Sequence, residues 1–251
     1  MVLQEVGLSS LPRRPLWQPD INMTIPRYLH ADLHTHPLGD KYYYHPSRQL
    51  SSADRDAISR FLYSFCSSGL HLLACTDHHS VASGQWAKEE ASRRGYPFTV
   101  IPGAEVVVLG ASQRLHLLAL NISADLAVSR LTLKEAAAQI RRQGGVAVLA
   151  HPVKYPQELK KNPELLISLD GIERVNLSEG IFEVDRYLNG NSCYQNRYIQ
   201  QTGGSDFHWN PDESGASPAS IYRKEFPFHA PVRWLLEKGL LSNAELERMV
   251  V

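Results

Sequence analysis

Short apolar runs alternate with amphipathic stretches along most of this chain, and this alternation most restricts the folds it can adopt. Apolar runs typical of strands cover 28–34, 71–76, 98–101, 146–150 and 171–175, and residues 106–109 and 115–120 form a hairpin pattern around Gly110. Amphipathic patterns predict helices from Ser51 or Ser52 to about Gly69, over 83–94, from Thr132 to Gly144, over 158–168 and over 191–201, with two short helices in 231–251 split at Gly239. Such alternation predicts an α/β fold with a mostly parallel sheet, and six or more units suit a barrel.

Composition excludes several classes of protein. The 251 residues are 43% hydrophobic, and 26 basic residues cancel 26 acidic ones. A neutral chain is a poor match for wrapping nucleic acid or coating an anionic membrane. No apolar run approaches the roughly 18 residues of a membrane span, and residues 1–17 lack the pattern of a secretory signal.

The ends and the cysteines give further expectations. Four prolines within residues 1–27 predict an irregular N-terminal arm, which leaves 28–251 as a single domain ending in short helices. Cys66, Cys75 and Cys193 are isolated and odd in number, which favours reduced thiols and a cytoplasmic location.

Each predicted strand runs into side chains that can bind a metal ion. These are His34 and His36, Asp77 to His79, Glu105, His116, His151, and Asp206 with His208. The carboxyl ends of barrel strands meet on one face, so these residues are expected to converge. Singly, each histidine could be a core residue and each acid a loop or turn residue. Together, so many buried ionisable groups would be unfavourable without a compensating cation.

Five of these segments resemble motifs of the polymerase and histidinol phosphatase (PHP) family. They are Asp32–His36 (DLHTH), Thr76–His78 (TDH), Pro102–Glu105 (PGAE), Ala150–Pro152 (AHP) and Gly204–His208 (GSDFH). The motifs occur in the family's order, and the resemblance covers roughly residues 28–225. It implies a distorted (β/α)7 barrel of the PHP type and a trinuclear metal centre that hydrolyses phosphoesters.

The resemblance also implies a set of metal ligands. His34, His36, Glu105 and Asp206 would hold the first ion; Glu105 would bridge to a second, held also by His116 and His151; Asp40, His78 and His208 would hold the third. Glu105, Asp206 and His208 would then be catalytic. His45 is the alternative to Asp40 as a ligand of the third ion. His79 has no counterpart in the motif and is interpreted as a neighbour, while Asp32 and Asp77 are expected to orient imidazoles.

The donor set limits the cofactor. All nine ligands offer nitrogen or oxygen and none a thiolate, which suits two to three divalent ions of Zn, Mn or Fe. Such ions could activate a hydroxide for direct attack on phosphorus. Lys154, three residues after His151, is the candidate for binding substrate phosphate, and Arg114 and Arg223 are further candidates.

The leading hypothesis is therefore a metal-dependent phosphoesterase acting on a small phosphorylated molecule, either a phosphomonoester or a nucleotide. A histidinol-phosphatase-like enzyme, an amidohydrolase-type hydrolase and a non-catalytic PHP module are the alternatives. Only 35 residues separate His116 from His151, which leaves no room for a lid domain. Substrate selection is expected from loops 37–50, with Tyr42 to Tyr44, and 177–200. The oligomeric state stays open.

Overall fold

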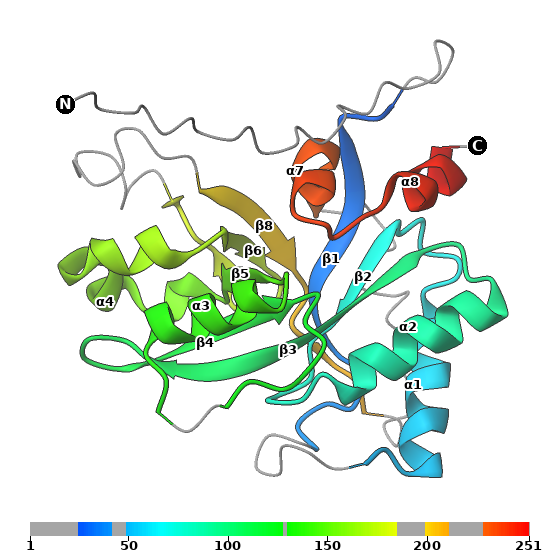
Figure 1. Cartoon of the computed structure of the whole chain (residues 1–251), viewed down its shortest axis with the longest axis horizontal. Helices are drawn as coiled ribbons and strands as arrows, with labels where there is room; N and C mark the ends of the chain where they lie inside the picture. Colours follow the sequence, from blue (N-terminus) through cyan, green and yellow to red (C-terminus); the bar gives the residue numbers. More distant parts are fainter. Residues whose placement is uncertain (1–24, 42–48, 128–129, 185–198, 211–227, 251) are drawn as a thin grey trace, which may run out of the picture.

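The computed structural model describes residues 25–41, 49–127, 130–184, 199–210 and 228–250 (Figure 1). The elements in chain order are β1 (Tyr28–His36), α1 (Ser52–Ser64), β2 (Leu72–Cys75), α2 (Ala82–Arg94), β3 (Thr99–Leu109), β4 (Arg114–Leu120), α3 (Leu133–Arg142), β5 (Val146–Leu149), the 3₁₀ turn η1 (Pro152–Lys154), α4 (Pro156–Lys161), the 3₁₀ turn η2 (Pro163–Ser168), β6 (Gly171–Asn176), β7 (Gly180–Ile181), β8 (Gln200–Gly204), β9 (Phe207–His208), β10 (His229–Pro231), α7 (Val232–Glu237) and α8 (Asn243–Val250). Most of the predicted N-terminal arm, residues 1–24, lies outside the described residues.

The strands form one curled sheet that returns to its beginning. The order runs from β1 through β6, and β8 pairs with β6. β1, β2 and β3 are parallel, β4 is antiparallel to both β3 and β5, and β6 is parallel to both β5 and β8. The next short strand, β9, then pairs with β1 through Thr35↔Phe207 and His36↔His208. The predicted α/β class with a distorted barrel is confirmed, with antiparallel pairing around β4.

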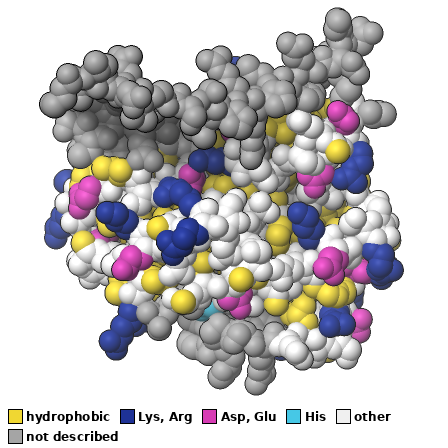
Figure 2. All heavy atoms as spheres, in the orientation of Figure 1, with side chains coloured by type: hydrophobic (Ala, Val, Ile, Leu, Met, Phe, Trp, Pro, Cys, Tyr) yellow, Lys and Arg dark blue, Asp and Glu magenta, His cyan; other side chains and the backbone are white. Residues whose placement is uncertain are grey.

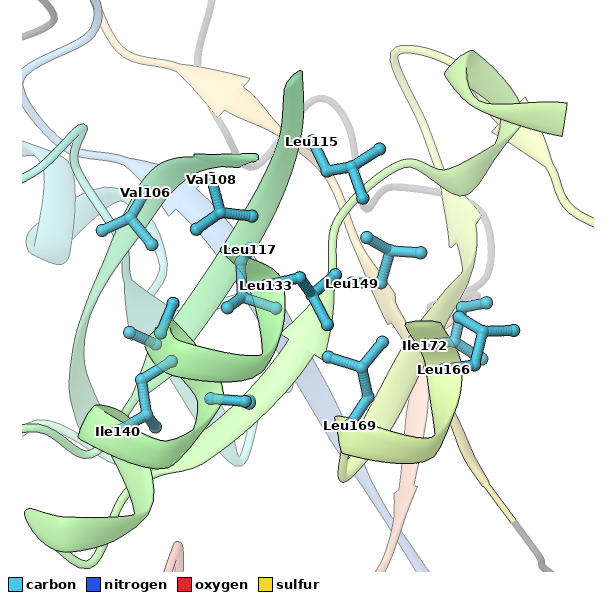
Figure 3. Packing of buried hydrophobic residues seen from close by; sticks show 14 of the residues in the cluster. Val106, Val108, Leu115, Leu117, Leu133, Ile140, Leu149, Leu166, Leu169 and Ile172 are labelled. Atoms are coloured by element: carbon cyan, nitrogen blue, oxygen red, sulfur yellow. The ribbon is translucent and has the colours of Figure 1, made fainter. Parts of the chain in front are cut away.

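Helices α1, α2 and α3 cover the outer face of the sheet, where alternate strand residues meet them. α1 and α2 pack on β2 and β3. α3 lays Leu133 and Ile140 against Val106, Leu117 and Leu149 of the neighbouring strands (Figure 3). The strand residues that alternate with Val106, Leu117 and Leu149 point to the inner face of the sheet.

The inner face is apolar toward one end of the barrel. Leu33, Ala74, Leu118 and Val148 pack there in one cluster, which Leu235 of α7 and Leu246 of α8 complete. In Figure 1 these two red helices lie beside the beginning of β1. The apolar cluster fills the end where the parallel strands begin, so polar inner-face residues can gather only at the other end.

Local signals place several helix ends correctly. Ser51 caps α1 in a capping box with Asp54, and Thr132 caps α3 in the same way with Glu135. Gly95 ends α2 in the left-handed conformation, at φ +65°. Two short C-terminal helices, α7 and α8, flank Gly239 as expected. Each of these signals acts within four residues, so sequence alone can reveal them.

β3 differs from the prediction, which had split it at Pro102–Gly103 into two short strands. The strand continues through both residues: Pro102 pairs with Cys75, and Gly103 pairs with Leu120. A Cβ on Gly103 would lie 2.8 Å from the carbonyl oxygen of Ala119. Glycine is therefore needed here for the close approach of β4, not for a break.

Two predicted helices are also corrected. The helix expected over 158–168 is divided into α4 and η2 at Pro163, which has no N–H to donate. The helix expected over 191–201 falls mostly outside the described residues, but its end is wrong, because Gln200 and Gln201 begin β8. These residues pair with Gly171 and Ile172 of β6, a long-range interaction that local helical periodicity does not contain.

The charged surface agrees with the neutral composition. On the face shown in Figure 2, basic and acidic side chains are interspersed among apolar ones. In the described part of the chain, the helices are too short or too polar to cross a bilayer.

Candidate metal centre

A bulge in β1 delivers the first two histidines to the centre. Leu29 and Leu33 belong to the inner apolar cluster, so strict alternation would turn His34 and His36 outward. The pairing register between β1 and β2 shifts between Asp32 and Thr35. This irregularity changes which alternate residues face inward, and both imidazoles enter the site fully buried.

Four side chains from β1, β3 and the segment after β8 then converge. His34 Nε2 lies 3.1 Å from His36 Nε2. Asp206 Oδ1 lies 3.3 Å from the first of these nitrogens and 3.2 Å from the second. Glu105 places Oε1 at 3.6 Å from His34 Nε2 and Oε2 at 3.5 Å from His36 Nε2. These four side chains form one group that could hold a metal ion.

Glu105 also belongs to a second group. Its Oε1 lies 2.8 Å from His116 Nδ1 and 2.9 Å from His151 Nε2. Glu105 and His116 stand on the antiparallel strands β3 and β4, where their strand partners are Leu118 and Val107. Both residues follow the regular period of two that turns Leu118 inward.

The third group combines His36, His78 and His208. His78 Nδ1 lies 3.1 Å from Glu105 Oε2, which links this group to the other two. Asp40 Oδ1 lies 3.0 Å from His208 Nδ1 and 3.6 Å from His78 Nε2. The Asp40 side chain is 76% exposed, so it borders the centre from the solvent side. His45, its competitor, lies outside the described residues.

The charges of the centre depend on one another. Burial lowers the pKa of His34, but Asp206, Glu173 and Glu105 outweigh burial and raise it well above its usual value. Burial lowers the pKa of His36 to about 3. For Glu105 burial raises the pKa, yet the facing imidazoles, His34 first among them, hold it well below the usual range. The imidazoles and carboxylates therefore stabilise one another's charged forms only in part, and His36 stays neutral.

The residues fit a metal ion. Donors around a tetrahedral ion with bonds of about 2.0–2.1 Å lie about 3.3 Å apart. The five separations in the first group, from 3.1 to 3.6 Å, fall around that value. His34 Nε2 and His36 Nε2 are so close that they either share one hydrogen or both face one metal ion. Both side chains are completely buried.

Backbone conformations at the centre are unusual. His79, His151 and Asp206 have φ values of +59°, +28° and +56°. Ala150 packs in the inner apolar cluster, so regular alternation would turn His151 outward. The positive φ instead directs it inward. Such conformations cost about 1–3 kcal/mol each and persist where surrounding structure enforces them.

Two buried residues of the centre were missed in the sequence. Glu173 accepts a hydrogen bond from His34 Nδ1 at 3.2 Å, and Asn176 Nδ2 donates to Glu173 Oε2 at 2.9 Å. The signal was a charged residue inside the apolar strand run 171–175. Asp32 and Asp77, expected to orient imidazoles, accept backbone N–H groups of His34 and Leu38.

Two of the three expected phosphate-binding residues, Lys154 and Arg114, lie among the described residues. Lys154 Nζ forms an ion pair with Glu179 Oε1 at 2.7 Å, and both side chains are partly exposed. Arg114 is exposed at the start of β4, and Arg223 lies outside the described residues. A cavity of about 310 Å³ borders the centre, lined by Leu177, Ser178, Ser205, Asp206, Phe207 and His208. It offers space for a small substrate beside Asp206 and His208.

Comparison with known proteins supports the fold. Neither a known sequence family nor a curated protein matches this chain. A structure from Bifidobacterium adolescentis, described as a candidate metal-dependent phosphoesterase, is 14% identical, with a TM-score of 0.55 over 85% of this chain and 97% of that one. An amidohydrolase from Chromobacterium violaceum, with bound sulfate and no metal, is 18% identical, with a TM-score of 0.50 over 71% of this chain and 87% of that one.

A third structure is a two-domain protein from Bacteroides vulgatus with a predicted PHP-like metal-dependent phosphoesterase. It is 16% identical, with a TM-score of 0.47 over 76% of this chain and 57% of that one. At identities this low, the first two structures establish a common fold and no more. The fold agrees with the resemblance that the five sequence motifs carry.

Proposed function

We propose that this protein is a PHP-type metal-dependent phosphoesterase that hydrolyses a small phosphorylated molecule. One observation carries the proposal: three groups of metal donors share Glu105 or His36 and meet at one end of the barrel. A polynuclear arrangement of this kind suits displacement at phosphorus, where attacking and leaving oxygens both carry charge.

The proposed ligands follow the three groups, except that Asp40 takes the place of His36 in the third. His34, His36, Glu105 and Asp206 would hold one ion; Glu105, His116 and His151 would hold a second; His78, His208 and Asp40 would hold a third. Two to three divalent ions per chain are expected, of Zn, Mn or Fe, since imidazole and carboxylate donors do not discriminate among these. When bound, such ions supply an activated water and neutralise charge on the phosphoryl group.

The chain's own groups position the substrate. Asp206 and His208 border the 310 Å³ cavity, so the reacting phosphorus would enter from that side. The hydroxyls of Ser178 and Ser205 in the cavity donate to backbone carbonyls, those of Ser205 and His34 respectively. Neither hydroxyl is paired with a base, which favours direct attack by water over a covalent phosphoenzyme.

Lys154 is proposed to bind a phosphoryl oxygen. It is the last residue of η1, the turn that begins directly after His151. Because Glu179 already holds its ammonium group, substrate phosphate must compete with this carboxylate. A dianionic phosphate offers more negative charge than a single carboxylate, so exchange of partners is electrostatically reasonable.

Amide hydrolysis is the second candidate, because the amidohydrolase from Chromobacterium violaceum shares the fold. The amidohydrolase pattern uses a metal-bridging lysine, whereas the bridging position here belongs to Glu105. Phosphoester hydrolysis is therefore favoured. A histidinol-phosphatase-like activity is a narrower form of the same proposal, and a non-catalytic role would leave the complete ligand set without a use.

Free Cys66 and Cys75 agree with a proposed cytoplasmic location.

The test combines metal analysis with a substrate screen. Protein purified without chelator and supplied with metal should contain two to three ions per chain and hydrolyse phosphomonoesters or small phosphodiesters. Chelation should abolish this activity and added metal restore it. A content of one ion or fewer would overturn the polynuclear centre. Hydrolysis of amides but not phosphoesters would select the second candidate, and trapping of a phosphorylated side chain would contradict direct attack.

A further inference from the structure

Glu173 is buried beneath the metal donors without belonging to any of the three donor groups. It stands on β6, where the register against β8 shifts between Glu173 and Val175. The shift lets Glu173 and Asn176, three residues apart, both face the centre, although regular alternation would place them on opposite faces. Only 1% of Glu173 and 2% of Asn176 is exposed.

The Glu173 carboxylate accepts hydrogen bonds from three directions. His34 Nδ1 lies 3.2 Å from Oε1. The backbone N–H of His151 donates to Oε2 at 2.7 Å, and Asn176 Nδ2 donates to the same oxygen at 2.9 Å. Asn176 Nδ2 also lies 3.4 Å from Asp206 Oδ2. The Glu173 carboxylate thus accepts hydrogen bonds from one residue of the first proposed metal site, His34, and from one residue of the second, His151.

The backbone of β8 passes close to His34 and Glu173 at Gly204. A Cβ on Gly204 would lie 2.4 Å from His34 Cβ and 2.5 Å from Glu173 Oε1. Only glycine lets β8 pass so close to the pair. The His34 ring therefore has little freedom to turn away from Glu173.

We infer that Glu173, supported by Asn176, is a positioning residue that sets the His34 ring and the His151 backbone for metal binding. This inference rests on the metal centre of the proposed function. A carboxylate only accepts hydrogen bonds, so Glu173 keeps a hydrogen on His34 Nδ1 and leaves Nε2 as the atom that would bind the ion. Carboxylates behind metal-binding histidines commonly act in this way.

The chemistry of a glutamine at this position makes the inference testable. In Glu173→Gln the single amide oxygen would satisfy the two donors at the Oε2 position, His151 N–H and Asn176 Nδ2. The amide NH₂ would then face His34 Nδ1, which must accept. His34 would carry its hydrogen on Nε2, the atom that should bind the ion.

The experiment compares Glu173→Gln with Glu158→Gln. Glu158 is equally buried, at 1% exposed, but it binds the hairpin turn at Ala111 and Ser112. Affinity is measured by competition of zinc against a chromogenic chelator, and coordination by visible absorption of the cobalt-loaded protein. Glu173→Gln should bind the ion that His34 would hold about 10- to 100-fold less tightly and show an altered cobalt spectrum. Glu158→Gln should match wild type in both, whatever its melting temperature.

The outcomes are distinct. Wild-type affinity and spectrum in a folded Glu173→Gln would overturn the inference while leaving the proposed metal centre intact. Absence of bound metal in wild type would instead remove the proposed function. If Glu173→Gln does not fold, Asn176→Ala takes its place, because it removes the Nδ2 donor to Glu173. It should also weaken zinc binding, and unchanged affinity would overturn the inference.

Discussion

At the scale of single residues, Glu105 occupies the position on which the centre depends. Its two oxygens face imidazoles of all three donor groups, from β1, from β4 and from the segments that follow β2 and β5. His208, in contrast, lies at the rim with 37% of its side chain exposed. Substitutions at the two positions should therefore differ in kind.

Glu105→Gln is expected to lose most bound metal and essentially all turnover, because it removes a negative charge shared by the donor groups. His208→Ala should retain nearly two ions per chain, with activity impaired but present. Elemental analysis and initial rates on a phosphoester measure both effects. Full metal content and rate in Glu105→Gln would show that Glu105 is a bystander.

Lys154 gives a second prediction at this scale. Lys154→Ala should raise KM for a phosphoester about three- to tenfold and change kcat less, since a partly exposed charge-assisted bond is weakened by solvent. Glu179→Ala, which frees the ammonium group, should lower KM or leave it unchanged. Equal KM values in wild type and Lys154→Ala would show that Lys154 does not bind the substrate and only forms its ion pair with Glu179.

At the scale of elements, helices here are stabilised by both local caps and packing. α3 is bounded by the Thr132–Glu135 capping box and buries Leu133 and Ile140 on the strands beneath. The cap satisfies backbone donors that the helix cannot satisfy itself. The packing fixes the helix to the outer face.

Thr132→Ala should lower the free energy of unfolding by about 1 kcal/mol, because the Glu135 N–H loses its acceptor. Chemical denaturation followed by circular dichroism measures the change. Lys134→Ala, an exposed substitution in the same helical turn, is the control and should have little effect. An equal loss in both variants would show that the loss in Thr132→Ala does not come from the cap hydrogen bond.

At the scale of the whole molecule, metal binding and folding should be coupled. The donors come from segments spread over residues 34–208, so an ion that binds them binds only the folded chain. Removal of metal should lower Tm by several degrees, and added metal should restore it. Differential scanning calorimetry at matched ionic strength, with and without chelator, measures the shift. An unchanged Tm would show that the site contributes nothing to folding.

The opposite end of the barrel carries a second histidine cluster, His30, His71 and His229. The His30 ring centroid lies 5.3 Å from that of His71 and 4.9 Å from that of His229. Burial, and secondarily His30, lowers the pKa of both His71 and His229. β1 and β10 pair through His30↔His229, so positive charge on these histidines would weaken the pairing of the two strands.

This cluster predicts a pH dependence of stability. A histidine whose pKa is lowered on folding takes up a proton more readily when unfolded, where its pKa is about 6.5. Stability should therefore decrease as pH falls below about 6.5. His229→Gln should lose less stability than wild type between pH 7.5 and 5.5 in denaturant titrations. Equal losses would show that these histidines do not contribute.

The sequence by itself determined the features that depend on local order. Alternation of apolar runs and helices specified the α/β class, and the capping residues specified the starts of α1 and α3. The period of two placed Glu105 and His116 on the inner face, because β3 and β4 are regular where these residues lie. For such positions, the direction of a side chain follows from its neighbours.

Only the tertiary structure decided the remaining geometry. His34 and Glu173 enter the centre through register shifts in β1 and β6, and His151 through a positive φ that reverses the expected direction. Gln200, helical by local pattern, becomes a strand because β6 offers a partner. The physical reason is common to all four: each conformation is stabilised by groups from other strands, whose contacts outweigh local preference and cannot be read from neighbouring residues.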